Sequence, residues 1–281
     1  MSVKVYAGIV TYNPDICKLK ENIKAIKEQV EKIIIVDNNS NNIDDIIQMA
    51  DDCILICNNV NKGIAHALNQ IMQYSYENRV QWCVTLDQDS VCPKNLIDTA
   101  KKIMLDGSVG QIVPQIKDVG TGEVPTLDSK ANNQEYQIVK KCITSASVTN
   151  VKIWKIIGGF DNDLFIDYVD FDYSIRLRNA GYKIIRMNNV YLEHELGESV
   201  YRYLFFKKVR VANHSAFRKY YICRNIVIYI RRYYRNVNVL FEILRIFKTI
   251  LFSILYEKEK RKKVFSCIKG VKDGILFKIK K

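Results

Sequence analysis

The first 90 residues alternate short apolar runs, rich in β-branched side chains, with segments whose apolar positions recur at helical spacing. The runs cover residues 3–10, 32–36, 53–57 and 82–86. Continuous apolar runs of this length are typical of strands buried on both faces of a parallel sheet. The pattern therefore predicts an α/β fold with a mostly parallel sheet flanked by helices.

Each apolar run ends in a polar cluster, at residues 11–13, 37–40, 58–63 and 87–90. The carboxyl ends of parallel strands meet at one edge of a sheet, where ligands bind. We therefore expect the four clusters to share one rim. No G-x-G-x-x-G follows the first run, which disfavours a dinucleotide site of the usual kind.

Asp87 and Asp89 follow the fourth run with one residue between them, so strand geometry points both carboxylates to one side. Unpaired carboxylates are costly to bury. Two of them at a strand end indicate a site for a hard divalent cation, Mg²⁺ or Mn²⁺. The alternative is local: Asp87 begins a turn, and Asp89 with Ser90 caps a helix predicted over 93–105.

Charge is unevenly distributed along the 281 residues. Residues 201–281 hold 22 Lys and Arg against 4 Asp and Glu, and residues 1–200 hold 21 against 26. A basic arm of this kind favours an anionic partner, a membrane surface or nucleic acid. No RNA-binding motif is present, so we expect no nucleic-acid partner.

Apolar residues over 239–255 alternate with Glu242, Arg245 and Lys248, a pattern typical of a helix in a membrane interface. A helical cap on the protein's own core, or a homodimer contact, is the alternative. The eight cysteines form no C-x-x-C pair and indicate reduced thiols in a cytosolic protein. Neither a signal peptide nor a spanning apolar segment is expected. We therefore expect a cytoplasmic protein, peripheral on the inner face of the plasma membrane.

The motifs VTYNP, VDNNS, NKGIAHALNQ and LDQDS, in this order, resemble the nucleotide-binding half of family-2 glycosyltransferases, which have the GT-A fold. The resemblance covers roughly residues 3–200. It implies a GT-A domain over 1–200, with a nucleotide-binding half (1–113) and an acceptor half (114–200). A basic helical region over 201–281 would then serve membrane association or oligomerisation.

By this resemblance Asp37 accepts a hydrogen bond from the ring N–H of uracil or thymine, because a carboxylate is acceptor-only. A turn residue after a strand is the alternative for Asp37. Asp89 would bind the metal, and Asp87 the ribose, a metal-bound water or the metal itself. The residues implied to contact the nucleotide sugar are Thr11, Tyr12, Asn13, Asp37, Asn39, Asn61, Lys62, Gly63, Asp87 and Gln88.

The stretch LFIDYVDFDYSIR resembles the acceptor-side motif of the same family, Glu-Asp followed by an apolar residue, Asp and Arg. Aligned on Arg176, Asp170 takes the place of the catalytic Asp. Val169 replaces the usual Glu, as in the rhamnosyltransferase-like branch. We expect Asp170 to be the general base that deprotonates the acceptor hydroxyl.

Two local interactions are expected around this motif, in a helix predicted over 168–180. Asp167 would be its N-cap, with Asp170 three residues on as in a capping box. Asp172 and Arg176 lie four residues apart and would pair on one helix face.

Five further residues are weaker candidates. Thr144 and Ser145 lie in a strand predicted over 141–148 and would face the sugar pocket, or only one side of the strand. His194 follows two predicted strands, and the resemblance implies a contact with metal or diphosphate. Arg218 and Arg224 lie in HSAFRKYYICRN, which resembles a segment of rhamnosyltransferase-like members, and would bind phosphates. Their alternative is a helix with solvated charges.

The expected function is an inverting transfer from dTDP-L-rhamnose to a hydroxyl of a lipid-linked or surface polysaccharide acceptor. A polar loop over 117–133 would lie near that acceptor. The alternatives are a UDP-sugar transferase of the same fold, for galactofuranose, glucose or galactose, a nucleotidyltransferase, and a non-catalytic membrane-binding module. Nucleotidyltransferases usually carry a basic Gly-rich loop after the first strand, which Thr11-Tyr12-Asn13-Pro14 does not supply.

Overall fold

The computed structural model describes residues 3–118, 134–194, 199–204 and 206–279. The chain forms two compact units, described here one at a time. Unit 1 comprises Met1–Asn162 and Asp170–Glu195. Unit 2 comprises Leu196–Lys281 together with Asp163–Val169, a short segment taken from the middle of the sequence of unit 1. The predicted acceptor loop over 117–133 lies almost entirely outside the described residues.

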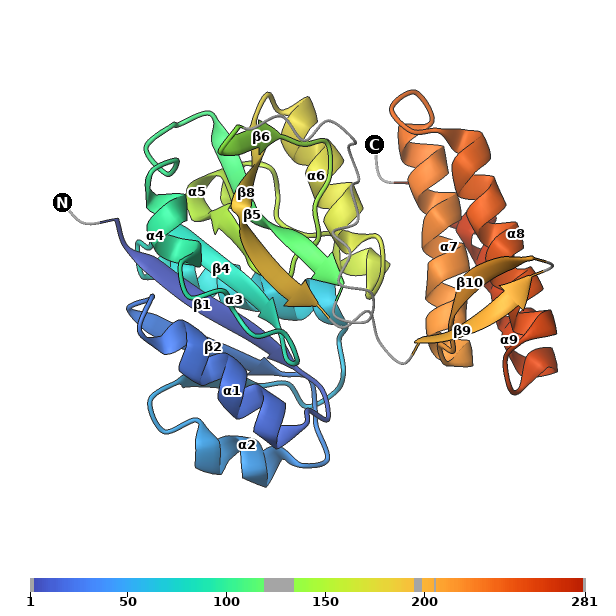
Figure 1. The fold of residues 1–281 in the computed structure, drawn as a ribbon, viewed down its shortest axis with the longest axis horizontal. Coiled ribbons are helices and arrows are strands. Elements are labelled where there is room, and N and C mark those ends of the chain that lie inside the picture. The colour runs from blue at the N-terminus through green and yellow to red at the C-terminus, as the bar shows by residue number, and fades with distance from the viewer. Residues whose placement is uncertain (1–2, 119–133, 195–198, 205, 280–281) are drawn as a thin grey trace. The chain divides into compact units, whose positions relative to one another are not determined.

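Unit 1 is built on an eight-stranded sheet with the order β3-β2-β1-β4-β7-β5-β8-β6 (Figure 1). Strands β3, β2, β1 and β4 are mutually parallel, as are β5 and β8, whereas β7 and β6 run antiparallel to their neighbours. The predicted α/β fold with a mostly parallel sheet is confirmed. The strands are β1 (Val5–Thr11), β2 (Lys32–Asp37), β3 (Ile54–Cys57), β4 (Trp82–Asp87), β5 (Val109–Asp118), β6 (Tyr136–Ile138), β7 (Ser147–Asn150) and β8 (Lys183–His194).

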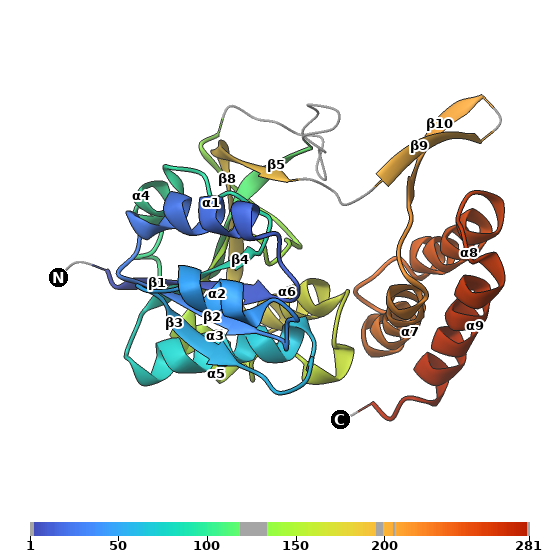
Figure 2. The ribbon, with the colours of Figure 1, turned by 90° about the horizontal axis from the view of Figure 1, so that it is seen from below.

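Helices cover both faces of this sheet. Helices α1 and α4 lie on one face, and α3 and α5 on the other (Figure 2). The close approach of α3 to β1 requires a glycine, because a Cβ on Gly8 would lie 2.1 Å from the Ile71 side chain. The helices of unit 1 are α1 (Ile16–Lys27), α2 (Ile43–Met49), α3 (Ile64–Glu77), α4 (Leu96–Lys101), α5 (Val151–Ile156) and α6 (Val169–Asn179), of which only the first residue, Val169, belongs to unit 2. A 3-10 turn covers Asn162–Leu164, where the chain passes from unit 1 to unit 2.

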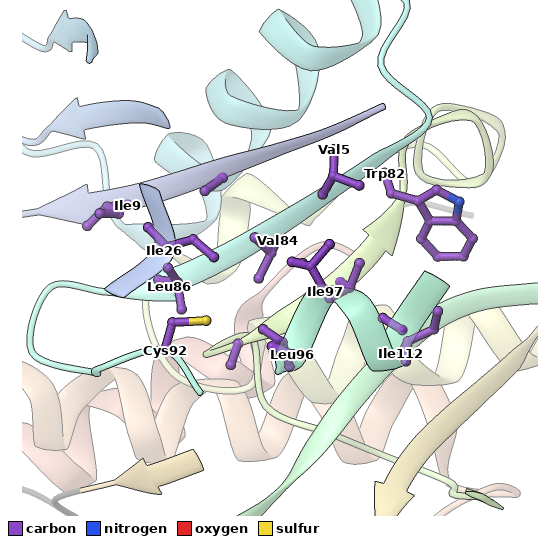
Figure 3. Packing of buried hydrophobic residues seen from close by; sticks show 14 of the residues in the cluster. Val5, Ile9, Ile26, Trp82, Val84, Leu86, Cys92, Leu96, Ile97 and Ile112 are labelled. Atoms are coloured by element: carbon purple, nitrogen blue, oxygen red, sulfur yellow. The ribbon is translucent and has the colours of Figure 1, made fainter. Parts of the chain in front are cut away.

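The core on the α1 and α4 side follows from the two-residue period of the strands. Val5 and Ile9 of β1 and Val84 of β4 point to the same face, where they meet Ile26 of α1 and Leu96 of α4 (Figure 3). All five side chains are buried. This apolar layer fixes the register of the central strands, and hence the level at which their polar ends emerge.

Several element boundaries differ from those expected. The strand predicted over 141–148 begins only at Ser147, and the residues before it form a loop and turn. The two strands predicted over 182–187 and 190–192 are one long strand, β8. Its register against β5 shifts between Pro114 and Gln115. Proline has no N–H to donate to the ladder, which explains an irregularity at this point.

Unit 2 begins with a β-hairpin, β9 (Ser199–Leu204) and β10 (Lys207–Ala212), ahead of the helices expected for residues 201–281. The run SVYRYL is rich in β-branched and aromatic residues, which suit a strand. Three helices follow, α7 (Ala216–Tyr233), α8 (Val239–Leu255) and α9 (Lys260–Leu276). Within the described residues, none of the helices is both long enough and apolar enough to cross a bilayer.

Helices α7 and α9 pack with their backbones in direct contact. A Cβ on Gly270 of α9 would lie 2.3 Å from the Tyr220 carbonyl oxygen of α7. A buried charge cluster lies in the same unit, where Glu257 accepts from Lys219 at 2.6 Å and from Lys263 at 3.0 Å. All three side chains are 1–4% exposed. Glu257 thus bonds to two buried lysines at once.

Candidate functional site

Three polar strand ends lie at one edge of the unit 1 sheet. Strand β1 is paired with β2 on one side and with β4 on the other, with Thr11 opposite Asp37 and Val10 opposite Asp87. Thr11, Asp37 and Asp87 therefore leave the sheet at the same level on three adjacent strands. The expected rim exists, and its register brings these three residues together.

The Asp37 carboxylate is 1% exposed and is held by donors of the protein. Oδ1 accepts from Thr11 Oγ1 at 2.8 Å and from Ser40 Oγ at 2.5 Å, and Oδ2 accepts from the Ser40 backbone N–H at 2.8 Å. A carboxylate has about four acceptor positions, and within the described residues these donors occupy three of them. Thr11 is itself fully buried, and its hydroxyl positions Asp37. Ser40 was missed as a site residue, although the spacing of three residues from Asp37 in VDNNS is a turn signal.

Backbone-to-side-chain bonds join the loops after β1, β2 and β4. Gln88 Oε1 accepts from the Tyr12 backbone N–H at 2.8 Å, which links the first and fourth strand ends. Asn13 N donates to Ser40 Oγ at 2.7 Å, which links the first and second. The Tyr12 ring is half exposed and the Asn39 side chain is exposed. Hydrogen bonds within the protein therefore hold the rim, and Tyr12 and Asn39 are exposed on it.

The loop after β3 is tied to the same rim. Asn38 Nδ2 donates to the Gly63 carbonyl at 3.2 Å, and Asn58 Nδ2 donates to Asn38 Oδ1 at 3.1 Å. Asn61 Oδ1 accepts from Gly63 N, and Gly63 has φ 84°, a conformation that favours glycine. Lys62 is exposed beside them, at the start of α3. Asn38 and Asn58 were not predicted, because single amides after strands give no distinctive sequence signal.

The carboxylates proposed for a metal lie at the end of β4 and in the turn after it. Strand β4 ends at Asp87, and Asp89 lies in a turn in which the Ser90 backbone N–H donates to the Asp87 carbonyl at 3.3 Å. The strand geometry that was expected to point both carboxylates to one side therefore does not extend to Asp89. Asp87 is half-buried and Asp89 is exposed, and Asn22 Nδ2 fixes the turn by donating to the Asp87 carbonyl at 2.8 Å. In the described part of the chain, no group of three or more His, Cys, Asp or Glu is placed to hold an ion. An oxygen-only pair fits Mg²⁺ or Mn²⁺, which bind to one or two carboxylates and complete their shells with substrate phosphates. The backbone of His194 ends β8, and its side chain lies outside the described residues.

Asp170 is the second residue of α6 and is half-buried. Its Oδ1 accepts from the Phe171 backbone N–H at 2.9 Å. Burial raises the pKa of the Cys142 thiol to about 12, and the nearby negative charge of Asp170 contributes to the increase. Asp170 therefore lies near the loop that leads into β7.

That loop carries Thr144 and Ser145 and is anchored to β4. Thr85 Oγ1, two residues before Asp87, donates to the Thr144 carbonyl at 2.7 Å. Ser145 is buried, and its hydroxyl has no hydrogen-bond partner within the described residues. The loop thus connects the end of β4 with the surroundings of Asp170.

The two local interactions predicted around α6 had different outcomes. Asp172 pairs with Arg176 at 2.8 Å, as predicted. Asp167 is not the N-cap of α6, which begins at Val169 with Tyr168 before it. Its carboxylate instead accepts from Arg218 Nε at 3.2 Å and Nη2 at 3.1 Å. A bidentate pair with a guanidinium is stronger than a capping bond, which explains the difference.

Arg218 and Arg224 both bond to groups of unit 2. Arg218 bonds to Asp167, and an Arg224 Nη2 hydrogen bond goes to the Asp163 carbonyl. The Arg224 guanidinium also lies over the Tyr221 ring, 5.2 Å from its centroid. The predicted phosphate contacts of these arginines stay predictions.

The sequence and the fold of this chain are similar to those of known proteins. Residues 6–160 match the sequence profile of glycosyl transferase family 2. The chain belongs to this family. The chain is also 28% identical to the dTDP-rhamnosyl transferase RfbF of Shigella flexneri. The alignment spans 268 residues and covers 91% of this chain and 88% of that protein.

Solved structures show the same fold. GalNAc-T7, crystallised with UDP, GalNAc and Mn²⁺, superposes with a TM-score of 0.61 at 14% identity, over 98% of this chain and 56% of that one. Residues 1–349 of S. aureus TarS superpose with a TM-score of 0.56 at 12% identity, over 97% and 81% of the two chains. The predicted family and the GT-A fold are confirmed, and this family-2 protein is a glycosyltransferase.

Proposed function

We propose that this glycosyltransferase moves L-rhamnose from dTDP-L-rhamnose to a hydroxyl of a lipid-linked or surface polysaccharide acceptor. The observation that carries the proposal is the similarity over 91% of the chain to a protein named dTDP-rhamnosyl transferase. The rim formed by Thr11, Asp37 and Asp87 supports a nucleotide site at the carboxyl ends of the strands.

The base would be thymine or uracil, because each carries a single imide N–H. The remaining acceptor position on Asp37 Oδ2 suits that donor, and the other positions are occupied by Thr11 and Ser40. The exposed ring of Tyr12, the residue after Thr11, would offer a face for the base. Asn13, Asn39, Asn61, Lys62, Gly63 and Gln88 are proposed to complete the contacts to ribose and diphosphate.

Asp89, with Asp87, would hold Mg²⁺ or Mn²⁺, and a divalent ion supplies positive charge that offsets the charge growing on a leaving diphosphate. The Mn²⁺ in the crystal structure of GalNAc-T7 supports a divalent ion in this fold. Asp89 is exposed, so it can take such an ion without the cost of burying an unpaired carboxylate.

Asp170 is proposed as the general base of a single displacement. Its carboxylate takes the proton of the acceptor hydroxyl while the hydroxyl oxygen attacks C1 of the sugar. The bond from C1 to the diphosphate oxygen breaks, and its electron pair leaves with the diphosphate. One displacement inverts the configuration at C1 and needs no covalent intermediate.

A donor panel tests this proposal. With Mn²⁺ present, dTDP-L-rhamnose should raise the melting temperature and support transfer to membrane extract, and nucleoside triphosphates should do neither. An N3-methyl dTDP analogue should bind at least about tenfold more weakly, because it cannot donate to Asp37. If the enzyme turns over a UDP-sugar in preference, that UDP-sugar is the donor and dTDP-L-rhamnose is not. If only nucleoside triphosphates raise the melting temperature, a nucleotidyltransferase is favoured.

Membrane association is proposed for unit 2, because α8 is apolar on its exposed face. Its buried residues include Glu242 and Ser253, and Lys248 is exposed at the border of the apolar face. The exposed apolar side chains of α8 are Leu240, Phe241, Ile243, Leu244, Phe247, Leu251, Ile254 and Leu255. A helix of this kind, in a unit rich in Lys and Arg, suits an anionic lipid surface on the cytoplasmic side.

Vesicle sedimentation tests this surface directly. The protein should bind vesicles with anionic headgroups, bind neutral ones weakly, and lose most binding in the double variant Leu244→Glu, Leu251→Glu. Lys258→Glu, off the apolar face, is the matched control for charge. Concentration-dependent dimerisation that both leucine substitutions abolish, without vesicle binding, would assign the face to a homodimer.

A further inference from the structure

The segment directly before Asp170 is part of the C-terminal unit. Asp163–Val169 belongs to unit 2, although the residues on both sides of it belong to unit 1. Three of its non-glycine residues have left-handed backbones, Phe165 at φ 63°, Asp167 at φ 62° and Tyr168 at φ 66°. Such conformations cost energy and persist only where surrounding structure enforces them. Something must therefore hold this segment in place.

Asn225 of α7 supplies the central contact. Its side chain is fully buried, and Nδ2 lies 2.8 Å from the carbonyl oxygens of Leu164 and Ile166 and 3.0 Å from that of Asp167. Three oxygens around one atom identify that atom as the amide nitrogen, because only a donor fits there. Three backbone carbonyls of the segment Asp163–Val169 therefore point to the one side-chain amide of Asn225.

Other residues of α7 hold the side chains and the start of the segment. Arg218 makes its bidentate pair with Asp167. The Phe165 ring stacks on Tyr221 with centroids 4.8 Å apart. These contacts come from residues spaced three, four and seven apart, which share one face of a helix. We call this face of α7 the clamp, and its residues are Phe217, Arg218, Tyr221, Arg224 and Asn225.

We propose that the clamp sets the direction of the Asp170 carboxylate toward the acceptor, with Arg218 and Asn225 as positioning residues. The inference rests on the proposed role of Asp170 as base. Asp170 follows Tyr168 by two residues, so the path of the clamped segment decides where α6 begins and where its second residue points. A displacement of about 1 Å at a reacting group reduces a rate by up to about 10²-fold.

The test compares Arg218→Gln and Asn225→Asp with a matched control on the same helix. Arg231→Gln is the control, because Arg231 donates to the carbonyls of Gly274 and Phe277 and does not contact the clamped segment. In full-length protein, both clamp variants should lower kcat about 10- to 100-fold, and Asn225→Asp, which leaves both arginines in place, should keep the donor Kd and KM within about twofold. Arg231→Gln should leave all three unchanged.

Hydrogen exchange separates positioning from general destabilisation. Peptides covering residues 163–170 should exchange faster in the clamp variants, with α9 peptides unchanged. Arg218→Lys should have a higher kcat than Arg218→Gln but a lower one than wild type. Lysine keeps the positive charge but cannot make the two parallel N–H bonds of a guanidinium to Asp167. Wild-type kcat in both clamp variants would overturn the inference, and so would a fall in kcat that accompanies equally faster exchange across α9.

The two proposals fail in distinguishable ways. Wild-type turnover in Asp170→Asn would contradict the role of Asp170 as base in the proposed function. If Asp170→Asn loses turnover while Arg218→Gln and Asn225→Asp keep wild-type turnover, the role of Asp170 as base stands. Only the positioning role of the clamp is then contradicted.

Discussion

His214, in the segment between β10 and α7, makes the stability of unit 2 depend on pH. Burial, followed by the positive charge of Arg218, lowers the pKa of this imidazole to about 4. Lys219 acts in the same direction, whereas the carboxylates of Asp167 and Glu257 partly oppose the shift. The folded protein therefore favours the neutral ring.

The magnitude follows from the two pKa values. The pKa of this histidine is 6.5 in the unfolded chain and about 4 in the folded one, so below pH 6.5 the unfolded chain binds more protons. Above pH 6.5 both states are neutral at His214, and the free energy of unfolding has its full value. That stabilisation is lost as the pH falls from 6.5 toward 4, and at pH 5 the loss would be about 2 kcal/mol. Because the His214 side chain still reaches solvent, screening reduces the expected loss to about 1 kcal/mol.

Urea unfolding at about pH 7.5 and pH 5, followed in α7 by hydrogen exchange, measures this loss. His214→Gln keeps a neutral polar side chain and should remove about 1 kcal/mol of the pH dependence. The pKa of His66 is also lowered, chiefly by burial, so the difference between wild type and variant isolates His214. Equal pH dependence in both proteins would refute the reasoning.

Three further substitutions have defined outcomes. Glu257→Gln leaves its two buried lysine partners without a counter-charge and should cost about 3–5 kcal/mol in urea unfolding; a loss below 1 kcal/mol would mean that water reaches the cluster. Gly270→Ala places a methyl group 2.3 Å from the Tyr220 carbonyl and should cost about 1–3 kcal/mol, and an unchanged melting temperature would contradict this backbone contact. Thr11→Val removes the 2.8 Å hydrogen bond to Asp37 and should cost about 1.5–3 kcal/mol while weakening dTDP binding in calorimetry. Normal stability and normal affinity together would exclude the role given to Thr11.

Local and periodic signals were enough to predict the core of the fold. The apolar runs that became β1, β2 and β4 are buried on both faces, as expected for strands of a parallel sheet covered by helices. The pair between Asp172 and Arg176 was predictable because four residues bring two side chains to one helix face.

Long-range contacts account for what the sequence did not predict. The sequence around Asp167 is typical of a helix N-cap. The Asp167 carboxylate instead accepts from Arg218, which lies 51 residues further along the chain. The periodicity of residues 239–255 predicts an amphipathic helix but does not say which side is buried. In α8 the buried side includes Glu242, which is bonded to the Tyr168 hydroxyl, and the apolar side chains are largely exposed.

Asp37 illustrates the same limit within the site. Its motif suggested a free acceptor for a base, whereas Thr11 and Ser40 occupy three of about four acceptor positions. The Thr11 contact depends on the register between β1 and β2, which the sequence does not specify residue by residue.

Binding and chemistry measured separately on Asp170→Asn test the central claim most directly. Calorimetry with dTDP-L-rhamnose and Mn²⁺ gives the donor Kd, and single-turnover transfer to an acceptor extract gives the rate of the chemical step. The account predicts a Kd within about twofold of wild type and a rate lower by about 10²- to 10⁴-fold. A wild-type rate would contradict it.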